Sequence, residues 1–265
     1  MSWDYWERNL DPDLLGDLSL EGNVGGKIVL ITGASSGIGK TSALRLAEAG
    51  AHVLLVARTA EKLEETAAEI AELGGMATIY QADVSDLEDC DRLVAEVLQA
   101  HGHVDILLNN AGRSIRRSLE LSYDRFHDFE RTMQINYFGA VRLTMGLLPH
   151  MSERKQGHVI NMSSISALTP SPRFSAYVAS KSALDAWTRA AAVEYSDRNV
   201  RFTTINMPLV RTPMIEATSV YDSMPVLTPD EAADMVVEAV IKKPKRIATP
   251  LGVYLQVMTA LAPKF

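Results

Sequence analysis

A tyrosine and a lysine four residues apart, Tyr177 and Lys181, have the types and the spacing for proton transfer. In a helix, residues four apart lie on one face, so the phenol and the ammonium would project side by side. An adjacent positive charge stabilises the phenolate, which predicts a Tyr177 pKa below its usual value of about 10. Such a group exchanges a proton with a carbonyl oxygen as hydride reaches the carbon, while the hydroxyl of Ser164 holds that oxygen. The same pair also fits an ordinary amphipathic helix, so its meaning depends on the rest of the chain.

Composition limits the class of protein. The chain has 265 residues, of which 47% are hydrophobic and 22% charged, as expected for one globular domain with a sizeable core. A formal net charge of -7 and the lack of a dense Lys/Arg run argue against a nucleic-acid partner. The start of the chain lacks the apolar core of a signal peptide, and no apolar run has the length of a membrane span. These features favour a cytoplasmic protein.

Cysteine and histidine offer no further chemistry. The single cysteine, Cys90, lies at an acidic helix start that would raise the pKa of its thiol, which predicts a structural role. His101 and His103 lie in a polar turn without a convincing third ligand, so no metal site is expected.

The elements that must position Tyr177 and Lys181 alternate regularly along the chain. Short apolar runs predict buried strands at 27–32, 52–57, 78–81, 104–108, 158–162 and 201–206. Helices are predicted after the first strand to residue 49, and then at 60–73, 86–100, 123–150 and 175–197. Strands that alternate with helices of this length imply right-handed crossovers and a Rossmann-like, doubly wound parallel sheet of the α/β class.

Residues 1–26 stand apart from this alternation. We interpret them as an N-terminal arm or linker that ends in a loop over Glu21–Gly26, ahead of a single domain at 27–265. Large aromatic residues so near a terminus are expected to pack on this domain, on a second subunit or on an upstream domain; a loose tail is the alternative. These aromatic residues are Trp3, Tyr5 and Trp6.

In a doubly wound sheet the ligand lies at the carboxyl ends of the strands. Gly33, Gly37 and Gly39 leave the first strand and open a helix, where glycine lets the backbone approach a pyrophosphate at the helix N-terminus. Their spacing, G-x-x-x-G-x-G, differs from the general dinucleotide pattern, and a mere tight turn is the alternative. The second strand ends at Arg58 without a carboxylate; because arginine accommodates a 2′-phosphate, the sequence predicts NADPH as the cofactor.

Two further strand ends carry candidate cofactor contacts. Asp83 is placed to accept a hydrogen bond from an adenine amino group, and Asn109–Gly112 would lay backbone along the cofactor. Asn, Asp and Gly also suit turns, so turn chemistry is the alternative for both segments.

These motifs, with Asn136, resemble the short-chain dehydrogenase/reductase family over nearly everything from 27 to about 247. The resemblance implies that Ser164, Tyr177 and Lys181 are catalytic, that Asn136 supports a water relay behind Lys181, and that Lys181 also binds the nicotinamide ribose. Leu209 departs from the family, which often has Gly after Pro208, so the loop over the nicotinamide is expected to run differently. The implied cofactor-binding residues are Gly33, Ser35, Ser36, Gly37, Ile38, Gly39, Arg58, Asp83, Val84, Asn110, Ala111, Gly112, Tyr177, Lys181, Pro208, Val210 and Thr212.

A narrower resemblance is to the bacterial fatty acyl-CoA reductases of the same type. It implies NADPH-dependent reduction of a long-chain fatty acyl-CoA to a fatty aldehyde, and further reduction of the aldehyde to an alcohol. The arm resembles the junction before the reductase domain of multidomain members, which implies a missing upstream domain. The segments that carry the narrower resemblance are Asn109–Arg117, Phe126–Gln134, Met207–Met214 and Lys245–Thr249.

Two regions are candidates for substrate binding. Arg113, Arg116 and Arg117 crowd the loop after the fourth strand and would meet the phosphates of coenzyme A or an acidic carrier; a solvated charge cluster is the alternative. The segment 207–227, rich in apolar side chains such as Met214, is expected to form a substrate loop over an acyl tail, although such residues also simply pack.

Two features bear on assembly. The charge-free run Leu251–Ala262 could flank an apolar entrance, a subunit contact or a peripheral contact with a membrane surface. In the resembling family, helices such as those predicted at 123–150 and 175–197 form subunit interfaces, which implies a homodimer or homotetramer.

Hydride addition to a thioester gives an oxyanion that Ser164 and Tyr177 would stabilise without a covalent enzyme intermediate. The same pair would protonate the alkoxide formed from an aldehyde, so the sequence does not separate these substrates, and it leaves the acyl chain length open. One alternative is a general short-chain alcohol or ketone oxidoreductase that acts on a 3-oxoacyl or other carbonyl substrate. Another is a non-catalytic NADPH-binding domain, for which Tyr177→Phe would have no effect.

Overall fold

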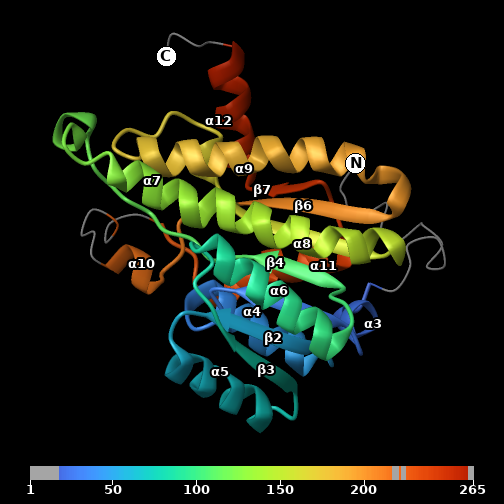
Figure 1. Ribbon diagram of the computed structural model, residues 1–265. Helices are drawn as coiled ribbons and strands as arrows, with labels where there is room; N and C mark the ends of the chain where they lie inside the picture. The colour runs from blue at the N-terminus through green and yellow to red at the C-terminus, as the bar shows by residue number, and fades with distance from the viewer. Residues whose placement is uncertain (1–17, 217–220, 222–224, 262–265) are drawn as a thin grey trace.

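The computed structural model describes residues 18–216, 221 and 225–261. Its seven strands are all parallel and lie in the order β3-β2-β1-β4-β5-β6-β7, so the chain crosses over between β3 and β4 (Figure 1). This order confirms the doubly wound α/β fold that the alternation predicts. The strands are β1 (Ile28–Thr32), β2 (His52–Ala57), β3 (Met76–Gln81), β4 (Ile106–Asn109), β5 (Gly157–Ser164), β6 (Val200–Met207) and β7 (Arg246–Ala248).

Helices cover both faces of the sheet. Those packed on one face are α3 (Leu20–Val24), α4 (Gly37–Glu48), α5 (Ala60–Glu72) and α11 (Pro229–Lys242). Those on the other face are α6 (Leu87–His101), α7 (His127–Met133), α8 (Gly139–Glu153) and α9 (Ser175–Glu194). The remaining helical segments are η1 (Leu119–Ser122), η2 (Gln134–Phe138), η3 (Ile165–Ala167), η4 (Ser196–Arg198), α10 (Pro213–Glu216) and α12 (Pro250–Leu261).

The strands alternate between two apolar cores, one on each face of the sheet. Val29 and Ile31 belong to the core under α4 and α11, whereas Leu30, Leu54 and Val56 belong to the core under α6 and α8. All five side chains are fully buried, and burial of each stabilises the fold by about 1.5–3 kcal/mol. The apolar runs in the sequence are continuous because a parallel sheet covered on both faces buries every position.

The helix that the sequence predicts over 123–150 is interrupted. Residues 119–122 form the short 3-10 helix η1, α7 begins at His127, and the π-turn η2 (Gln134–Phe138) separates α7 from α8. A π-turn widens the helix locally and is common at functional sites. At its end, Gly139 packs so closely that a Cβ there would lie 1.9 Å from the carbonyl oxygen of Val84. The π-turn thus ends where the chain approaches Val84 closely, a contact that apolar periodicity does not report.

The expected loop over Glu21–Gly26 is wrong in its first part, because α3 occupies Leu20–Val24. The hydroxyl of Ser19 caps this helix by accepting a hydrogen bond from the backbone N–H of Gly22 at 3.0 Å, and Val24 is fully buried. The cap and this burial outweigh the low helix propensity of Gly22. Trp3, Tyr5 and Trp6 lie outside the described residues.

The chain after β6 contains four elements that were not predicted from the sequence: α10, α11, β7 and α12. Thr228 and Glu231 form a capping box at the start of α11, with Pro229 at the first helical position. This Thr-Pro-Asp-Glu run is a signal from which α11 could have been predicted. Among the described helices, none has both the length and the apolar composition needed to cross a membrane.

Candidate active site

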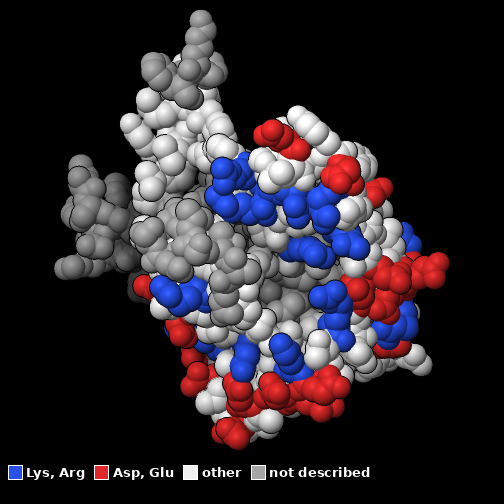
Figure 2. Space-filling view, turned by 90° about the vertical axis from the view of Figure 1, so that its left-hand side faces the viewer, with Lys and Arg blue, Asp and Glu red and all other residues white. Residues whose placement is uncertain are grey.

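A cleft of about 710 Å³ opens at the carboxyl ends of the strands. Figure 2 views the end of the molecule at which α10 lies, and Lys and Arg side chains gather across this face. The predicted site residues that line the cleft are Gly33, Ser35, Ser36, Gly37, Ile38, Arg58, Asp83, Val84, Asn110, Ala111, Gly112, Arg113, Ser164, Tyr177, Lys181, Pro208, Val210, Thr212 and Met214. Four other predicted residues are not part of this lining: Gly39, Asn136, Arg116 and Arg117.

The serine, tyrosine and lysine converge as their spacing predicts. Ser164 is the last residue of β5, held by pairing with β6, and it lines the cleft together with Tyr177 at the start of α9. One turn further along α9, Lys181 lies with its Nζ 6.0 Å from the centroid of the Tyr177 ring. The same Nζ donates a 2.7 Å hydrogen bond to the carbonyl oxygen of Met162. Two hydroxyls and one ammonium therefore meet at the floor of the cleft.

The predicted direction of the Tyr177 pKa is wrong. Burial raises the pKa of the Tyr177 phenol above its usual value of 10.0, and the hydrogen bond from Ser164 only partly offsets this shift. The Lys181 ammonium, also buried, has its pKa lowered to about 8, against the pull of the Asp185 carboxylate. Burial thus disfavours the charged form of both groups. The tyrosine keeps its proton at neutral pH, which is the state that a carbonyl reduction requires.

Asn136 is fixed behind the lysine by the π-turn. Its amide nitrogen donates at 2.9 Å to the carbonyl oxygen of Arg113 and at 2.9 Å to the hydroxyl of Ser180, and its Oδ1 accepts from the Arg113 N–H at 2.8 Å. Gly112 separates this amide from the lysine: a Cβ there would lie 3.1 Å from Asn136 Oδ1 and 3.3 Å from Lys181 Nζ. Asn136 therefore holds the loop after β4 against α9.

The turn between β1 and α4 offers backbone to a ligand. Gly33 and Gly37 adopt positive φ angles of 68° and 52°, which favour glycine. A Cβ on Gly39 would lie 2.2 Å from the carbonyl oxygen of Gly33 and 2.5 Å from the amide nitrogen of Asn110, so the turn has no room for a side chain. Ser36 begins α4 without a side-chain cap, which leaves the helix N-terminus facing the cleft. The turn therefore fits the phosphates of a dinucleotide.

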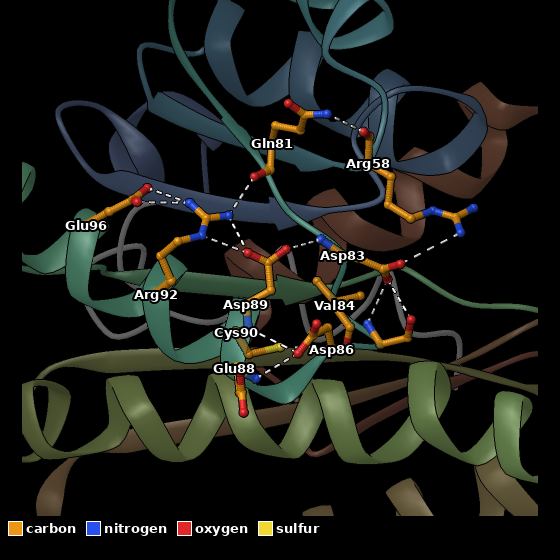
Figure 3. A network of polar contacts seen from close by, with 11 residues as sticks. Arg58, Gln81, Asp83, Val84, Asp86, Glu88, Asp89, Cys90, Arg92 and Glu96 are labelled. Atoms are coloured by element: carbon orange, nitrogen blue, oxygen red, sulfur yellow. Dashed lines mark hydrogen bonds and ion pairs between the residues drawn. The ribbon is translucent and has the colours of Figure 1, made fainter.

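The ends of β2 and β3 present a cation beside a carboxylate. Figure 3 shows Arg58 reaching toward Asp83, whose Oδ2 lies 3.9 Å from the Arg58 Nη1. The other oxygen of Asp83 accepts from the N–H and the hydroxyl of Ser85 at 2.9 and 2.6 Å, so Asp83 also shapes its own turn. Lys62, in the first turn of α5, lines the cleft as well and was not predicted from the sequence.

The segment after β6 forms the opposite wall. Val210 pairs with Leu227 in an isolated parallel bridge, and the Leu227 N–H donates to the carbonyl oxygen of Leu209 at 2.9 Å. Leu209 is not among the described residues with positive φ, so the turn takes a course open to any residue. Met214 and Tyr221 line the cleft, and the tyrosine was missed. Met224, in the predicted substrate loop, lies outside the described residues.

The three arginines after β4 separate. Arg113 lines the cleft, whereas the Nε of Arg117 lies 3.2 Å from the Asp128 carboxylate on α7, away from the cleft lining. Arg116 is close enough to Tyr221 to affect its pKa. Burial raises the pKa of the Tyr221 phenol, and the positive charge of Arg116 opposes that shift. Arg113 is therefore the member of the cluster that a ligand in the cleft would meet directly.

The structural interpretation of Cys90 is confirmed. The thiol is buried, and burial together with the neighbouring carboxylates raises its pKa to about 12. Across the ranges that the structure describes, no three His, Cys, Asp or Glu side chains are grouped as a metal site.

The site and the fold together agree with comparisons to known proteins. The pattern of the short chain dehydrogenase family matches residues 27–221, and the chain belongs to this family. It is therefore an oxidoreductase of the kind that uses NAD or NADP. A protein of Acinetobacter baylyi named fatty acyl-CoA reductase is 58% identical over 241 residues, 91% of this chain and 82% of that protein.

Two further comparisons extend this likeness. A protein of Mycobacterium tuberculosis, also named fatty acyl-CoA reductase, is 44% identical over 91% of this chain and 82% of its own length. The crystal structure of a metagenomic short-chain oxidoreductase in complex with NADP has a TM-score of 0.75 and 29% identity, covering 86% of this chain and 98% of that one. The resemblance expected from the sequence is thus confirmed at the level of the family.

Proposed function

We propose that this protein reduces a long-chain fatty acyl-CoA to a fatty aldehyde, with NADPH as the hydride donor. The observation that carries the reaction type is the convergence of the Ser164 and Tyr177 hydroxyls and the Lys181 ammonium in one cleft beside the glycine turn. The substrate class is supported by the two relatives named fatty acyl-CoA reductase, at 58% and 44% identity.

Bound NADPH supplies a hydride to the carbonyl carbon of the thioester. The hydroxyls of Ser164 and Tyr177 donate hydrogen bonds to the oxygen on which negative charge develops, and the Lys181 ammonium adds positive charge behind them. The tetrahedral oxyanion collapses as the carbon–sulfur bond breaks, and the thiolate of coenzyme A leaves and takes up a proton. For an aldehyde, the phenol of Tyr177 instead gives its proton to the alkoxide, which yields the alcohol.

The preference for NADPH rests on charge at the end of β2. The Arg58 side chain is 70% exposed and only loosely paired with Asp83 at 3.9 Å, so its guanidinium is available to a 2′-phosphate. Lys62 adds a second cation, and Thr59 begins α5 without a side-chain cap, which leaves that helix N-terminus open to an anion.

We assign substrate contacts to the loop after β4 and to the segment after β6. Arg113 is placed to meet an anionic part of coenzyme A, because it lines the cleft next to Asn136. Met214, half exposed on the wall after β6, supplies a flexible apolar surface for a long acyl chain.

Assembly as a homodimer or homotetramer is part of the same proposal. The outer faces of η2, α8 and α9 expose Phe138, Met145 and Val193, which are apolar side chains suited to a subunit contact. Light scattering coupled to gel filtration tests this point.

Single-turnover oxidation of NADPH across acyl-CoA and aldehyde chain lengths, with release of free coenzyme A monitored, tests the proposed reaction. We expect NADPH oxidation with long-chain acyl-CoA to release coenzyme A in a one-to-one ratio. Oxidation with aldehydes alone would restrict the protein to the second reduction. Turnover on ketones without turnover on either class would replace the proposal by a general alcohol or ketone oxidoreductase, and no turnover at all would favour a non-catalytic binding domain.

A further inference from the structure

The helix α12 (Pro250–Leu261) is apolar on the side that faces away from the protein. Figure 1 shows it standing away from the layered body. Leu251, Tyr254, Val257, Met258 and Leu261 are all exposed, and the exposed fraction of Leu261 reaches 77%. A surface helix normally buries its apolar stripe and exposes its polar side. In α12 this arrangement is reversed.

The polar and small residues of α12 face inward. Gly252, the buried residue of the helix, packs near Ile165 and Leu168: a Cβ there would lie 3.4 and 3.5 Å from their side chains. One turn later, the Oε1 of Gln256 accepts a 3.0 Å hydrogen bond from the Nη1 of Arg246 on β7. The helix is thus fixed to the body through its polar side, and this leaves the apolar side without a partner in the described part of the chain.

The exposed apolar surface is wide. At about 100° per residue, the exposed side chains of α12 span roughly 220° of the helix circumference. The helix carries no charged residue, and its 12 residues make it about 18 Å long. Ile165 also lines the cleft, so the base of the helix lies beside the opening through which a ligand enters.

Charge decides which partner fits this surface. After Glu238 the chain contains no Asp or Glu, although the whole protein has a net charge of -7. It does contain cations: Arg246 is exposed and hydrogen-bonded to Gln256 of α12, and Lys242, Lys243 and Lys245 are exposed in the preceding segment of the chain. A contact between two copies about a two-fold axis would bring the same cationic region of each copy together, which is unfavourable. Anionic lipid headgroups, in contrast, complement these cations while the acyl region accepts the apolar helix.

We propose that α12 is a lipid-docking helix, which inserts its apolar side into the interface of an anionic bilayer while Arg246 at its base lies near the headgroups. The inference stands on the surface of α12 and does not depend on the proposed reaction. It commits to a peripheral contact, because the helix is too short to cross the bilayer.

The test is co-sedimentation of the full chain with vesicles of phosphatidylcholine and phosphatidylglycerol. We expect the wild-type protein to bind, with an affinity that falls as salt concentration rises and is weaker for vesicles of phosphatidylcholine alone. The variant Tyr254→Gln/Val257→Gln/Leu261→Gln keeps good helix formers and removes three central apolar side chains. This variant is expected to bind the vesicles with an affinity at least about tenfold lower than that of the wild type.

The matched control is Leu73→Gln/Met76→Gln/Ile79→Gln, which makes the same chemical change at three exposed positions around α5 and β3. This control is expected to bind vesicles like the wild type. A second readout is Tyr254→Trp, whose fluorescence should be quenched by lipids brominated in the acyl chain. Wild-type protein that does not sediment with vesicles, or an α12 variant that binds as well as the control, would overturn the proposal. A change in oligomeric state of the α12 variant, with vesicle binding unaltered, would assign the helix to a contact between copies instead.

Discussion

The wall of the cleft between β1 and α4 is built from backbone, whereas the wall after β6 is built from side chains. In the first wall, Gly39 packs against Gly33 and Asn110 with no space for a Cβ, so its shape is fixed. In the second, Val210 and Leu227 form an isolated bridge among the described residues, and Met214 is half exposed. A wall of fixed backbone suits a constant group such as the phosphates of a dinucleotide. A wall of side chains suits a ligand whose shape can differ from one protein to another.

The floor between the two walls carries the largest predicted effect. Replacement Tyr177→Phe removes the phenol that donates to the substrate oxygen, and kcat is expected to fall about 1000-fold. Single-turnover NADPH oxidation measures this change. Tyr195→Phe, which removes a hydroxyl at the other end of α9, is the control and should leave the rate unchanged. Equal rates for Tyr177→Phe and the wild type would place the chemistry elsewhere.

A methyl group tests the rigidity of the backbone wall. In Gly39→Ala the new Cβ meets Gly33 and Asn110, so the Kd for NADPH is expected to rise about 100-fold and the free energy of unfolding to fall by about 1–3 kcal/mol. Fluorescence titration and urea unfolding measure the two quantities. Gly146→Ala, where a Cβ on α8 would meet the side chain of Val94 at 3.0 Å and lies away from the cleft lining, is the control for cofactor binding and should leave the Kd for NADPH unchanged. If Gly39→Ala binds NADPH normally, the wall is softer than its contacts indicate.

Charge at the edge of the backbone wall should select the cofactor. Replacement Arg58→Ala removes the cation assigned to the 2′-phosphate, at a cost of about 2 kcal/mol, so the KM for NADPH should rise about 30-fold. The KM for NADH is the internal control and should stay the same. A parallel rise for both cofactors would assign Arg58 to the fold of the turn rather than to recognition.

The Lys181 ammonium at the floor of the cleft should determine how kcat/KM depends on pH. The pKa of Lys181 is lowered to about 8, so the group is protonated below that pH and loses its charge above it. Because the positive charge stabilises the developing oxyanion, kcat/KM for reduction should be constant below pH 8 and fall about tenfold per pH unit above it. Stopped-flow assays between neutral and alkaline pH measure this limb. A rate that rises with pH in this range contradicts the assignment.

The side-chain wall should give the smallest and most selective effect. Replacement Met214→Ala removes a half-exposed apolar surface worth about 1 kcal/mol, so the KM for long-chain substrates should rise about fivefold. Short-chain substrates, which do not reach this wall, provide the comparison in the same assay. An equal effect on both chain lengths would remove Met214 from substrate recognition.

The backbone wall and the floor were largely predictable from the sequence. Glycine spacing and the four-residue spacing of Tyr177 and Lys181 report geometry directly, because positive φ needs glycine and a helix repeats every 3.6 residues. The end of β5 was harder to predict from the sequence. Ser163 and Ser164 are polar, yet both pair with β6 as buried strand residues. Their burial depends on long-range pairing that a local pattern does not contain.

Electrostatics and charge clusters were the least predictable features. Proximity to Lys181 indicated a lowered pKa for Tyr177, but burial of both groups reversed the direction. Arg113 and Arg117 are close in sequence, yet Arg117 pairs with Asp128 on another element, so sequence distance did not show which arginine faces the cleft. Burial and ion pairing depend on the assembled structure rather than on the spacing of residues.

The state of Cys90 makes the protein convenient for site-specific labelling. Its thiol is buried, with a pKa of about 12, so at neutral pH it presents almost no thiolate to an alkylating reagent. As the sequence holds no other cysteine, one introduced on α12 or on the wall after β6 would carry a fluorophore or spin label at that position alone. Movement of either region could then be followed in the otherwise native protein.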